Sequence, residues 1–497
     1  MVTDHSRNGN EAKDIAGVSS SLSKCNKTSS LGLRNHAACR SQLYCVAYIV
    51  VIVVALFERV SLTLVNREAN DNHFEVIQLL SENIRELSME DCRECFHPKL
   101  YYLVCVRVLD GLGTENIDSN ILISQSLNCI SGFLTLIVVW LGLRAQNPER
   151  LCLFLTFAWV ATNPRLIAIN SQVSNDSFCI LFGTIAIYFT ARMLRSDRIG
   201  DYVFAQVALG CAILTKGTSW PASLAILILL SSKAVFRLEV RIRYLIYAGI
   251  CTAMIAASIS FGGYDFENYD KYANLGKGEP LFFFDRTVVG RPGVISIWDS
   301  YFTFRYVDLL KNPINLREQE LEPFHRSSVW TQLYGRLHSV QFDFHPKSWR
   351  TQSDIAKNTN RVIFVLSISW LVVSMVGLAS CLLDFANRVR LQGVHFLGDG
   401  ERYIHLLVVI GYLSFIVFFT FSYRDFAAMN VIYIFPGILS FAIILQEGIR
   451  VVLDRLFRFS KHCGWGFVFV FLLLCIMYVQ GLELLVEQLS VVSGEGI

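Results

Sequence analysis

The feature that most constrains this chain is a series of apolar blocks, each long enough to cross a lipid bilayer. About 20 apolar residues span the hydrocarbon core of a membrane, and soluble domains carry nearer a quarter charged residues. Only 17% of these 497 residues are charged, and 53% are hydrophobic. The pattern predicts an all-α multi-pass membrane protein. Its clearest blocks lie at residues 43–57, 364–383, 405–421 and 467–479.

Charge along the chain predicts how it is threaded through the membrane. Residues 1–40 are polar, Ser-rich and basic, and they lack the early apolar stretch of a signal peptide. We therefore expect a disordered tail, which the positive-inside rule places in the cytoplasm. Residues 65–118 carry eleven carboxylates against five Lys and Arg, so we expect them on the outer side. The net charge of +3 gives no reason to expect a nucleic-acid partner.

Later basic clusters fall where an alternating path returns to the cytoplasm, which predicts about eleven transmembrane helices and an outer C-terminus. After the tail we expect an N-terminal transmembrane module (41–263), a folded outer loop (264–360) and C-terminal transmembrane helices (361–497). The spans are expected near residues 41–64, 119–143, 151–169, 176–194, 202–216, 218–232, 243–262, 361–383, 402–422, 427–448 and 464–486.

The first outer segment, residues 65–118, is too long for a plain connector. Apolar residues from Phe74 to Leu87 recur at helical spacing with acids between them, which is typical of a helix lying on the membrane surface. The run "KLYYLVCVRVL" (99–109) is too short to span the bilayer. We interpret it as a second interfacial helix, with Tyr101 and Tyr102 at headgroup depth.

Charged side chains gather where this path meets the outer face. Asp71 and His73 follow the first span, and Asp176 begins the fourth. Lys216 and Arg424 lie at outer ends of later spans, where a cation can hold a lipid phosphate. Each also has a simpler explanation, because acids favour helix N-termini and lysines at span ends reach for water. Two carboxylates and two cations on one face support a site hypothesis without identifying a reaction.

The pair Cys92 and Cys95, with His97 beside it, could close a small disulfide, form a redox pair or bind zinc. On an outer face a disulfide is the simplest of the three. A zinc site needs two further ligands, and His73 is one candidate. Asn175 begins a glycosylation sequon, but its closeness to a span makes it a poor acceptor.

Five short stretches occur in an order that resembles one enzyme class. They are "NDNH" (70–73), "HPKLYY" (97–102), "SND" (174–176), "LTK" (214–216) and "MNVIYIFPGIL" (429–439). The chain is similar over residues 41–445 to GT-C class membrane glycosyltransferases, in the branch of the protein O-mannosyltransferases and lipid A aminoarabinose transferases (family 39-like). It departs from the pattern at Lys99, where the family has a second proline. The family's acidic pair is reduced here, so Glu68 competes with Asp71 as the catalytic acid.

The resemblance implies a GT-C fold, with residues 41–263 as the catalytic module. It also implies transfer of a mannose-like sugar from a polyprenyl or dolichyl phosphate to an acceptor hydroxyl on a protein, lipid or glycan, with inversion. By analogy Asp71 is the base and Asp176 orients the acceptor or sugar. A divalent metal shared by these two acids stays an open alternative, and we assign no metal ligand. The expected substrate-binding residues are His73, His97, Tyr101, Tyr102, Lys216, Arg424 and Tyr433.

Two other function classes stay open at this stage. In a transporter or lipid flippase, the same charges would line a pathway at mid-depth in the membrane; here they gather on one side. A noncatalytic GT-C relative would keep the fold and lose the reaction. The many cysteines and the Ser-rich tail favour the endoplasmic reticulum or another endomembrane, with the plasma membrane as the alternative.

Overall fold

The structure is a computed structural model, which describes residues 19–494 apart from several gaps. Two expected site residues, Asp71 and Arg424, lie outside the described residues. Contacts divide the chain into residues 1–51 and 52–497, and we describe the second unit unless we state otherwise. The gaps are 70–71, 83–86, 88–90, 93, 96, 115, 147, 262–296, 315–327, 343–346, 350–352 and 423–428.

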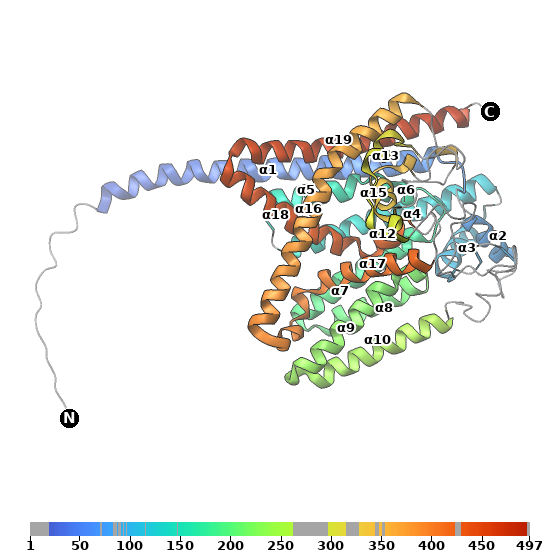
Figure 1. Ribbon diagram of the computed structural model, residues 1–497, viewed down its shortest axis with the longest axis horizontal. Coiled ribbons are helices and arrows are strands. Elements are labelled where there is room, and N and C mark those ends of the chain that lie inside the picture. Colours follow the sequence, from blue (N-terminus) through green and yellow to red (C-terminus); the bar gives the residue numbers. More distant parts are fainter. Residues whose placement is uncertain are drawn as a thin grey trace, which may run out of the picture. The chain divides into compact units, whose positions relative to one another are not determined.

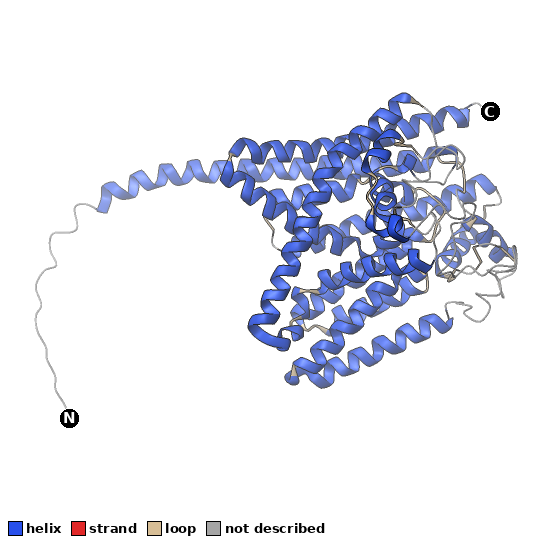
Figure 2. Ribbon diagram, viewed as in Figure 1, coloured by secondary structure: helices blue, strands red, loops and turns tan. Residues whose placement is uncertain are grey.

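Every regular element in the described ranges is a helix, as Figure 2 shows. The long helices are α1 (Ser19–Val65), α4 (Ile117–Ala145), α7 (Asp176–Ser196), α9 (Trp220–Phe236), α10 (Arg241–Phe261), α16 (Asp354–Gln392), α18 (Ile438–Phe459) and α19 (Lys461–Gly494). The shorter ones are α2 (His73–Glu82), α3 (Leu100–Leu112), α5 (Arg150–Thr162), α6 (Pro164–Asn170), α8 (Ile199–Ile213), α12 (Ile297–Phe302), α13 (Tyr306–Lys311), α15 (Val329–His338) and α17 (Ile404–Ser422). Single 3₁₀ segments are η1 (Gly217–Ser219), η2 (Leu238–Val240), η3 (Val340–Phe342), η4 (Lys347–Trp349), η5 (Gly393–Gly398), η6 (Gly400–Arg402) and η7 (Val431–Gly437).

The all-α multi-pass architecture is confirmed, but the count of eleven spans is not. Among the described residues, eight helices are long and apolar enough to cross a membrane, or nine if the bent pair α5–α6 is one span. Two further apolar helices, at 199–213 and 404–420, are shorter. Each of the eleven expected segments therefore coincides with an apolar helix, and the difference is one of length. The sequence shows where an apolar segment lies more clearly than whether it spans.

The first helix begins earlier than the sequence suggested. We expected residues 1–40 to form a disordered tail, whereas α1 already begins at Ser19; residues 1–18 lie outside the described part. Residues 19–40 contain no proline and one glycine, Gly32, so no residue there forces a helix to end. The polar composition of residues 19–40 argues against burial in a packed core, but a polar segment can still form a helix.

The long helices α4 and α7 run in the same direction with the bent pair α5–α6 returning between them, and α8 runs opposite to α7, so loops gather at both ends of the bundle (Figure 1). At one end, the N-terminus of α7 meets the C-terminus of α8, where Asn175 Nδ2 donates to the carbonyl of Thr215 at 3.2 Å. At the other, Arg195 Nη1 donates to the carbonyl of Ala145 at 3.0 Å, and its Nε pairs with Glu401. We call these the site end and the basic end.

Where a helix is interrupted, side chains of the bundle form hydrogen bonds with the backbone groups that lose their partners at the interruption. The chain bends by 47° between α5 and α6, where Asn163 caps α6 by accepting from the Leu166 amide. Arg59 of α1 donates to the carbonyl of Ala161 at 3.0 Å and to Asn170 Oδ1 at 3.1 Å. Inside a membrane an unpaired carbonyl costs several kcal/mol, on the order of a lost hydrogen bond, so Arg59 makes the bend tolerable.

Both long segments contain short helices, which the sequence suggested for residues 65–118, whereas for residues 264–360 it suggested only a folded loop. In the first, α2 and α3 form an apolar cluster with the beginnings of α4 and α7, and Figure 1 shows them together at the site end. In the second, α12, α13 and α15 lie among the described residues. These short helices position the site.

Candidate functional site

A buried ion pair lies at the centre of the site end. Asp176, the first residue of α7, is 5% exposed, and Lys216, which follows α8, is 8% exposed. Lys216 Nζ donates to Asp176 Oδ1 at 2.7 Å, and Ser174 Oγ donates to the other carboxylate oxygen at 2.6 Å. Burial lowers the pKa of Lys216, but Asp176 outweighs this effect and holds that pKa above its usual value. The lysine is therefore a permanent buried cation.

Hydrogen bonds join four of the five sequence motifs around this pair. The Tyr102 hydroxyl lies 2.7 Å from His73 Nδ1 and accepts from Asn175 Nδ2 at 3.4 Å. The backbone amide of Leu100 donates to the carbonyl of Leu214 at 3.1 Å. Motifs more than a hundred residues apart thus meet in one cluster. This contact pattern accounts for their joint presence in the sequence.

The two tyrosines, which the sequence suggested at headgroup depth, are buried inside the protein. Tyr101 and Tyr102 are both 0% exposed. The Tyr101 hydroxyl accepts from Asn128 Nδ2 at 3.1 Å, and the same amide group donates to the carbonyl of Ser174 at 2.8 Å. Because neither ring reaches the surface, a role in lining an open lipid entrance does not fit their burial. They form the wall that fixes α3 against the loop before α7.

The fifth motif approaches the pair from the late helices. The charges of Lys216 and Asp176 both act on Tyr433 of η7. Close packing makes this approach specific, because a Cβ on Gly183 of α7 would lie only 2.8 Å from the carbonyl oxygen of Pro436. Arg336 of α15, 1% exposed, donates to the carbonyl of Met429 at 3.1 Å and also acts on Tyr433. A second buried cation thus lies on the Tyr433 side of the site.

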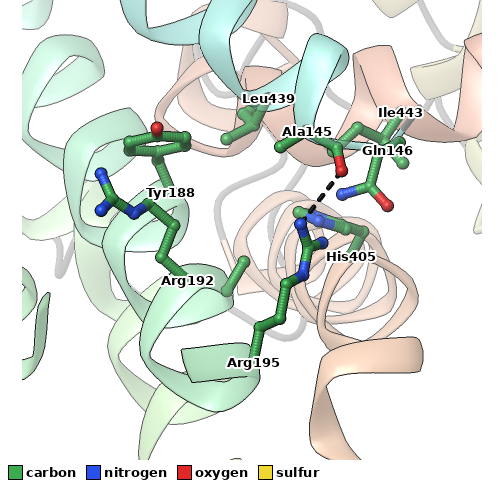
Figure 3. Close-up of a pocket in the computed structure, with 10 residues that line it drawn as sticks. Ala145, Gln146, Tyr188, Arg192, Arg195, His405, Leu439 and Ile443 are labelled. Atoms are coloured by element: carbon green, nitrogen blue, oxygen red, sulfur yellow. Dashed lines mark hydrogen bonds between the residues drawn. The ribbon is translucent and has the colours of Figure 1, made fainter. Parts of the chain in front are cut away.

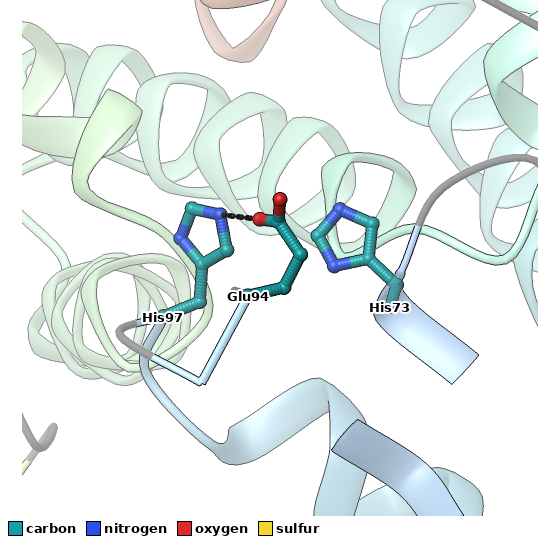
Figure 4. A group of neighbouring side chains, drawn as sticks. All are labelled: His73, Glu94 and His97. Carbon is teal, nitrogen blue, oxygen red and sulfur yellow. Dashed lines mark ion pairs between the residues drawn. The ribbon is translucent and has the colours of Figure 1, made fainter. Parts of the chain in front are cut away.

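A carboxylate between two imidazoles forms the other side. Figure 4 shows Glu94 between His73 and His97. His97 Nε2 lies 3.1 Å from Glu94 Oε2, and the two imidazole rings are 5.5 Å apart. Burial disfavours the charged form of Glu94, but its bond to His97 and the nearby cations lower its pKa to about 2. Burial also lowers the pKa of His97, to about 4. At neutral pH an ionised carboxylate accepts from a neutral imidazole.

The loop that carries Glu94 and His97 is closed by a disulfide between Cys92 and Cys95. The structure therefore bears out the disulfide interpretation of this pair over thiolate ligation. Within the loop, the His97 amide donates to the Glu94 carbonyl at 3.2 Å, and Lys99 Nζ donates to the Cys95 carbonyl. Lys99, which replaces a proline of the family pattern, thus supports the loop through its side chain.

The structure brings together most of the residues that the sequence singled out. Contacts or charge interactions connect His73, His97, Tyr102, Asp176, Lys216 and Tyr433. Asp71 lies outside the described residues, two positions before His73. Its rival Glu68 is exposed, and its Oε2 accepts from Ser348 at 2.8 Å. The sequence-based list missed Glu94 and Arg336. Glu94 had a signal, its i,i+3 spacing to His97 from a position between the two cysteines, whereas Arg336 had none.

Within the described part of the chain, two hollows have linings that do not include the ion pair. The first is at the basic end, between α4, α7 and α17, and its lining includes Arg192, Arg195 and His405 (Figure 3). Its volume of about 10 Å³ is room for one water. The second is an open apolar groove of about 520 Å³, lined by Trp330, Leu413, Ser414, Val417 and Phe418. Phe419, which follows the groove residue Phe418 in the chain, packs on Tyr433 with ring centroids 5.1 Å apart.

A comparison with protein families adds an independent observation. Residues 113–261 match the model of a family described as dolichyl-phosphate-mannose-protein mannosyltransferase. The resemblance to the GT-C class of membrane glycosyltransferases is confirmed. The matched segment runs from α4 to α10 and contains both Asp176 and Lys216. No protein with a curated description matches the sequence.

Solved GT-C proteins show distant similarity. The apo oligosaccharyltransferase of Archaeoglobus fulgidus is 12% identical, with a TM-score of 0.44 over 89% of this chain and 56% of that chain. The same organism's oligosaccharyltransferase AglB, in complex with an inhibitory peptide and a dolichol-phosphate, is 12% identical, with a TM-score of 0.45 over 89% of this chain and 56% of that chain. ArnT from Cupriavidus metallidurans, bound to undecaprenyl phosphate, is 14% identical, with a TM-score of 0.44 over 89% of this chain and 76% of that chain. The chain thus spans little more than half of the oligosaccharyltransferase length.

Proposed function

We propose that this protein moves a sugar from a polyprenyl phosphate to an acceptor hydroxyl at the site end, with inversion. The observation that carries the proposal is the buried pair of Lys216 and Asp176, around which the family motifs gather. Buried charges at the end of a bundle cost free energy, and they are retained where a charged ligand must be bound. The matched family's description favours mannose on dolichyl phosphate as the donor.

In the proposed reaction, an acceptor oxygen attacks the anomeric carbon from the face opposite the phosphate. The new carbon–oxygen bond forms as the bond to the phosphate oxygen breaks, and its electron pair leaves with the phosphate. The acceptor proton passes to a carboxylate, for which Asp71 is our proposed base. An aspartate with a pKa near 4 accepts this proton only as bond formation makes it acidic.

Negative charge on the departing phosphate needs a preorganised partner. Lys216 provides one, because it is charged and withdrawn from water. We proposed Arg424 from the sequence as the second, and it lies outside the described residues. Arg336 offers a described alternative, since it is buried and its charge reaches Tyr433. We propose that Asp176 holds Lys216 in place and orients the acceptor or sugar.

The apolar groove suits the tail of the donor. Its residue Phe418 is followed in the chain by Phe419, which packs on Tyr433. Its residue Trp330 precedes Arg336 on α15 by less than two helical turns. A polyprenyl chain in this groove would bring its phosphate towards Arg336. We therefore propose this groove as the lipid entrance.

The arrangement of charge favours a lumenal or outer location for the site end. Arg195, Arg237 and Arg243 all lie at the basic end, each paired with an acid, and such arginines favour the cytoplasmic side. An endoplasmic-reticulum membrane or another endomembrane is our proposal for the location, with a protein, lipid or glycan hydroxyl as the acceptor.

A panel of radiolabelled polyprenyl-phosphate sugars, incubated with purified protein, tests the proposal. We expect one donor, mannose-bearing first, to lose its label to an acceptor or to water. Transfer of labelled lipid across vesicles without loss of sugar would instead show a flippase. No turnover of any donor by folded protein, with or without acceptor peptides, lipids and glycans, would identify a noncatalytic relative and refute the proposal.

A further inference from the structure

We propose that His73, Glu94 and His97 bind a divalent cation of the zinc class. The inference goes beyond the proposed transferase activity, because metal binding at this place does not depend on which reaction the protein performs. It rests on a cluster of three side chains from two separate segments, shown in Figure 4.

The geometry of the cluster is close to that of a metal site. One ligand atom from each of the three residues lies within 4.8 Å of the others. Ligands of tetrahedral zinc lie about 2.0–2.2 Å from the ion, and so about 3.4 Å from each other. A shift on the order of 1 Å, within reach of side-chain rotation, would therefore close the cluster around an ion. The cation would replace the direct contact between Glu94 and His97.

The chemistry of the three ligands selects the metal. Two imidazoles and one carboxylate are the protein ligands of many catalytic zinc sites, and they leave a fourth position for water or another ligand. Magnesium and calcium prefer oxygen ligands, so a site with two imidazole nitrogens binds them poorly. The thiolates of Cys92 and Cys95 take no part, because they form a disulfide.

The surrounding structure holds the ligands in place. The disulfide and the backbone bond from His97 to Glu94 fix the loop that presents two of them. The third ligand, His73, is oriented by Tyr102, whose hydroxyl lies 2.7 Å from Nδ1. Such outer partners of a ligating histidine fix its ring and tautomer. Two segments separated by twenty residues are thus prepared to meet at one point.

The local charge also favours a cation. Metal ligands must be deprotonated, and Glu94 is the one carboxylate among the three ligands, so it supplies the negative charge of the cluster. Lys216 is an opposing charge at the site end, and Asp176 pairs with it at 2.7 Å. With Lys216 and Asp176 cancelling, the charge of Glu94 remains to attract the cation.

The test measures bound metal on the full-length protein in detergent, without added reductant. After chelation and dialysis, Zn²⁺ is titrated and the bound ion is counted per chain by mass spectrometry. We expect the wild type to bind about one ion per chain. The variants Glu94→Gln and His97→Gln should each lose this ion, because their affinity for Zn²⁺ falls at least about tenfold. The control Glu75→Gln, which removes an exposed acid of α2, keeps the ion.

Two further measurements test whether the ion is bound by Glu94 in the folded protein. Zn²⁺ should raise the thermal unfolding midpoint of the wild type and of Glu75→Gln, while leaving Glu94→Gln unchanged. Co²⁺ bound by the wild type and absent from Glu94→Gln should give a tetrahedral spectrum without thiolate charge transfer. Equal metal binding by wild type and both ligand variants would overturn the proposal. A thiolate band in the difference spectrum would also overturn it, because it would place the ion on cysteines.

Discussion

Lys216 Nζ lies 2.7 Å from Asp176 Oδ1 at the site end, and Lys233 Nζ lies 3.2 Å from Asp197 Oδ1 at the basic end. The two pairs use the same residue types in different surroundings. The acid of the first is almost fully buried, whereas the side chain of Asp197 is 39% exposed. Burying the first pair costs desolvation free energy, whereas the second pair is partly solvated. We expect this contrast if a charged ligand binds at the site end only.

This contrast predicts different coupling energies for the two pairs. Asp176→Asn alone should destabilise the protein by about 3 kcal/mol, because it leaves Lys216 buried without its counter-charge. The double variant with Lys216→Gln should recover part of that loss, giving a coupling energy of about 1–3 kcal/mol. For Asp197→Asn with Lys233→Gln the coupling should be below about 1 kcal/mol. Denaturant unfolding in detergent measures both cycles, and equal couplings would contradict the assignment.

The hydroxyl of Tyr102 should matter through His73. Tyr102→Phe removes the bond to His73 Nδ1 and the acceptor for Asn175. If His73 binds metal, affinity for Zn²⁺ should fall about 10- to 100-fold. Tyr101→Phe is the matched control, because its hydroxyl contacts Asn128. Metal titration of the two variants decides the matter, and an equal effect of both would show general loosening of α3.

Stability should fall with acidity in a way that reports His97. Its folded pKa of about 4 is below the ordinary value of 6.5, so the unfolded chain binds more protons between these pH values. Stability is therefore lost as pH falls from 6.5 to 4. Glu94, at about 2 against 4.5, adds a loss in the same direction between those values. His338, with a pKa of about 3, acts similarly, so a difference measurement is needed.

The unfolding midpoint of wild type and His97→Gln should be compared across that range. We expect the wild type to be more sensitive to acid between pH 6.5 and 4, with the two curves running parallel above pH 7. His395→Gln, an exposed residue at the basic end, should follow the wild type. A His97→Gln curve with unchanged slope would mean that this imidazole is not held neutral in the fold.

Much of this arrangement is readable from the sequence, for reasons that particular residues make clear. The apolar blocks locate every long helix, because bilayer burial leaves a strong compositional signal. Lys216 and Asp176 are detectable because each is a charged residue at the expected outer end of a span. The sequence also predicts the helices α2 and α3, since amphipathic spacing is a local property.

Other features depend on tertiary contacts. Whether Tyr101 and Tyr102 face lipid or a protein wall is decided by Asn128 and Asn175, which come from distant helices. Glu94 resembles the many solvated acids of its loop until His97 and His73 close around it. Arg336 belongs to a loop without a recognisable motif, and only its packing against Met429 places it near Tyr433.

The rate at which sugar leaves a polyprenyl-phosphate donor, measured for Lys216→Gln beside Lys233→Gln, tests the central claim most directly. Both changes remove a lysine paired with an aspartate, at opposite ends of the bundle. We expect Lys216→Gln to lower the rate about 100- to 1,000-fold, the effect of losing one preorganised donor to a leaving group. Lys233→Gln should stay within about threefold of the wild type. A folded Lys216→Gln protein that transfers sugar as fast as Lys233→Gln would contradict the account.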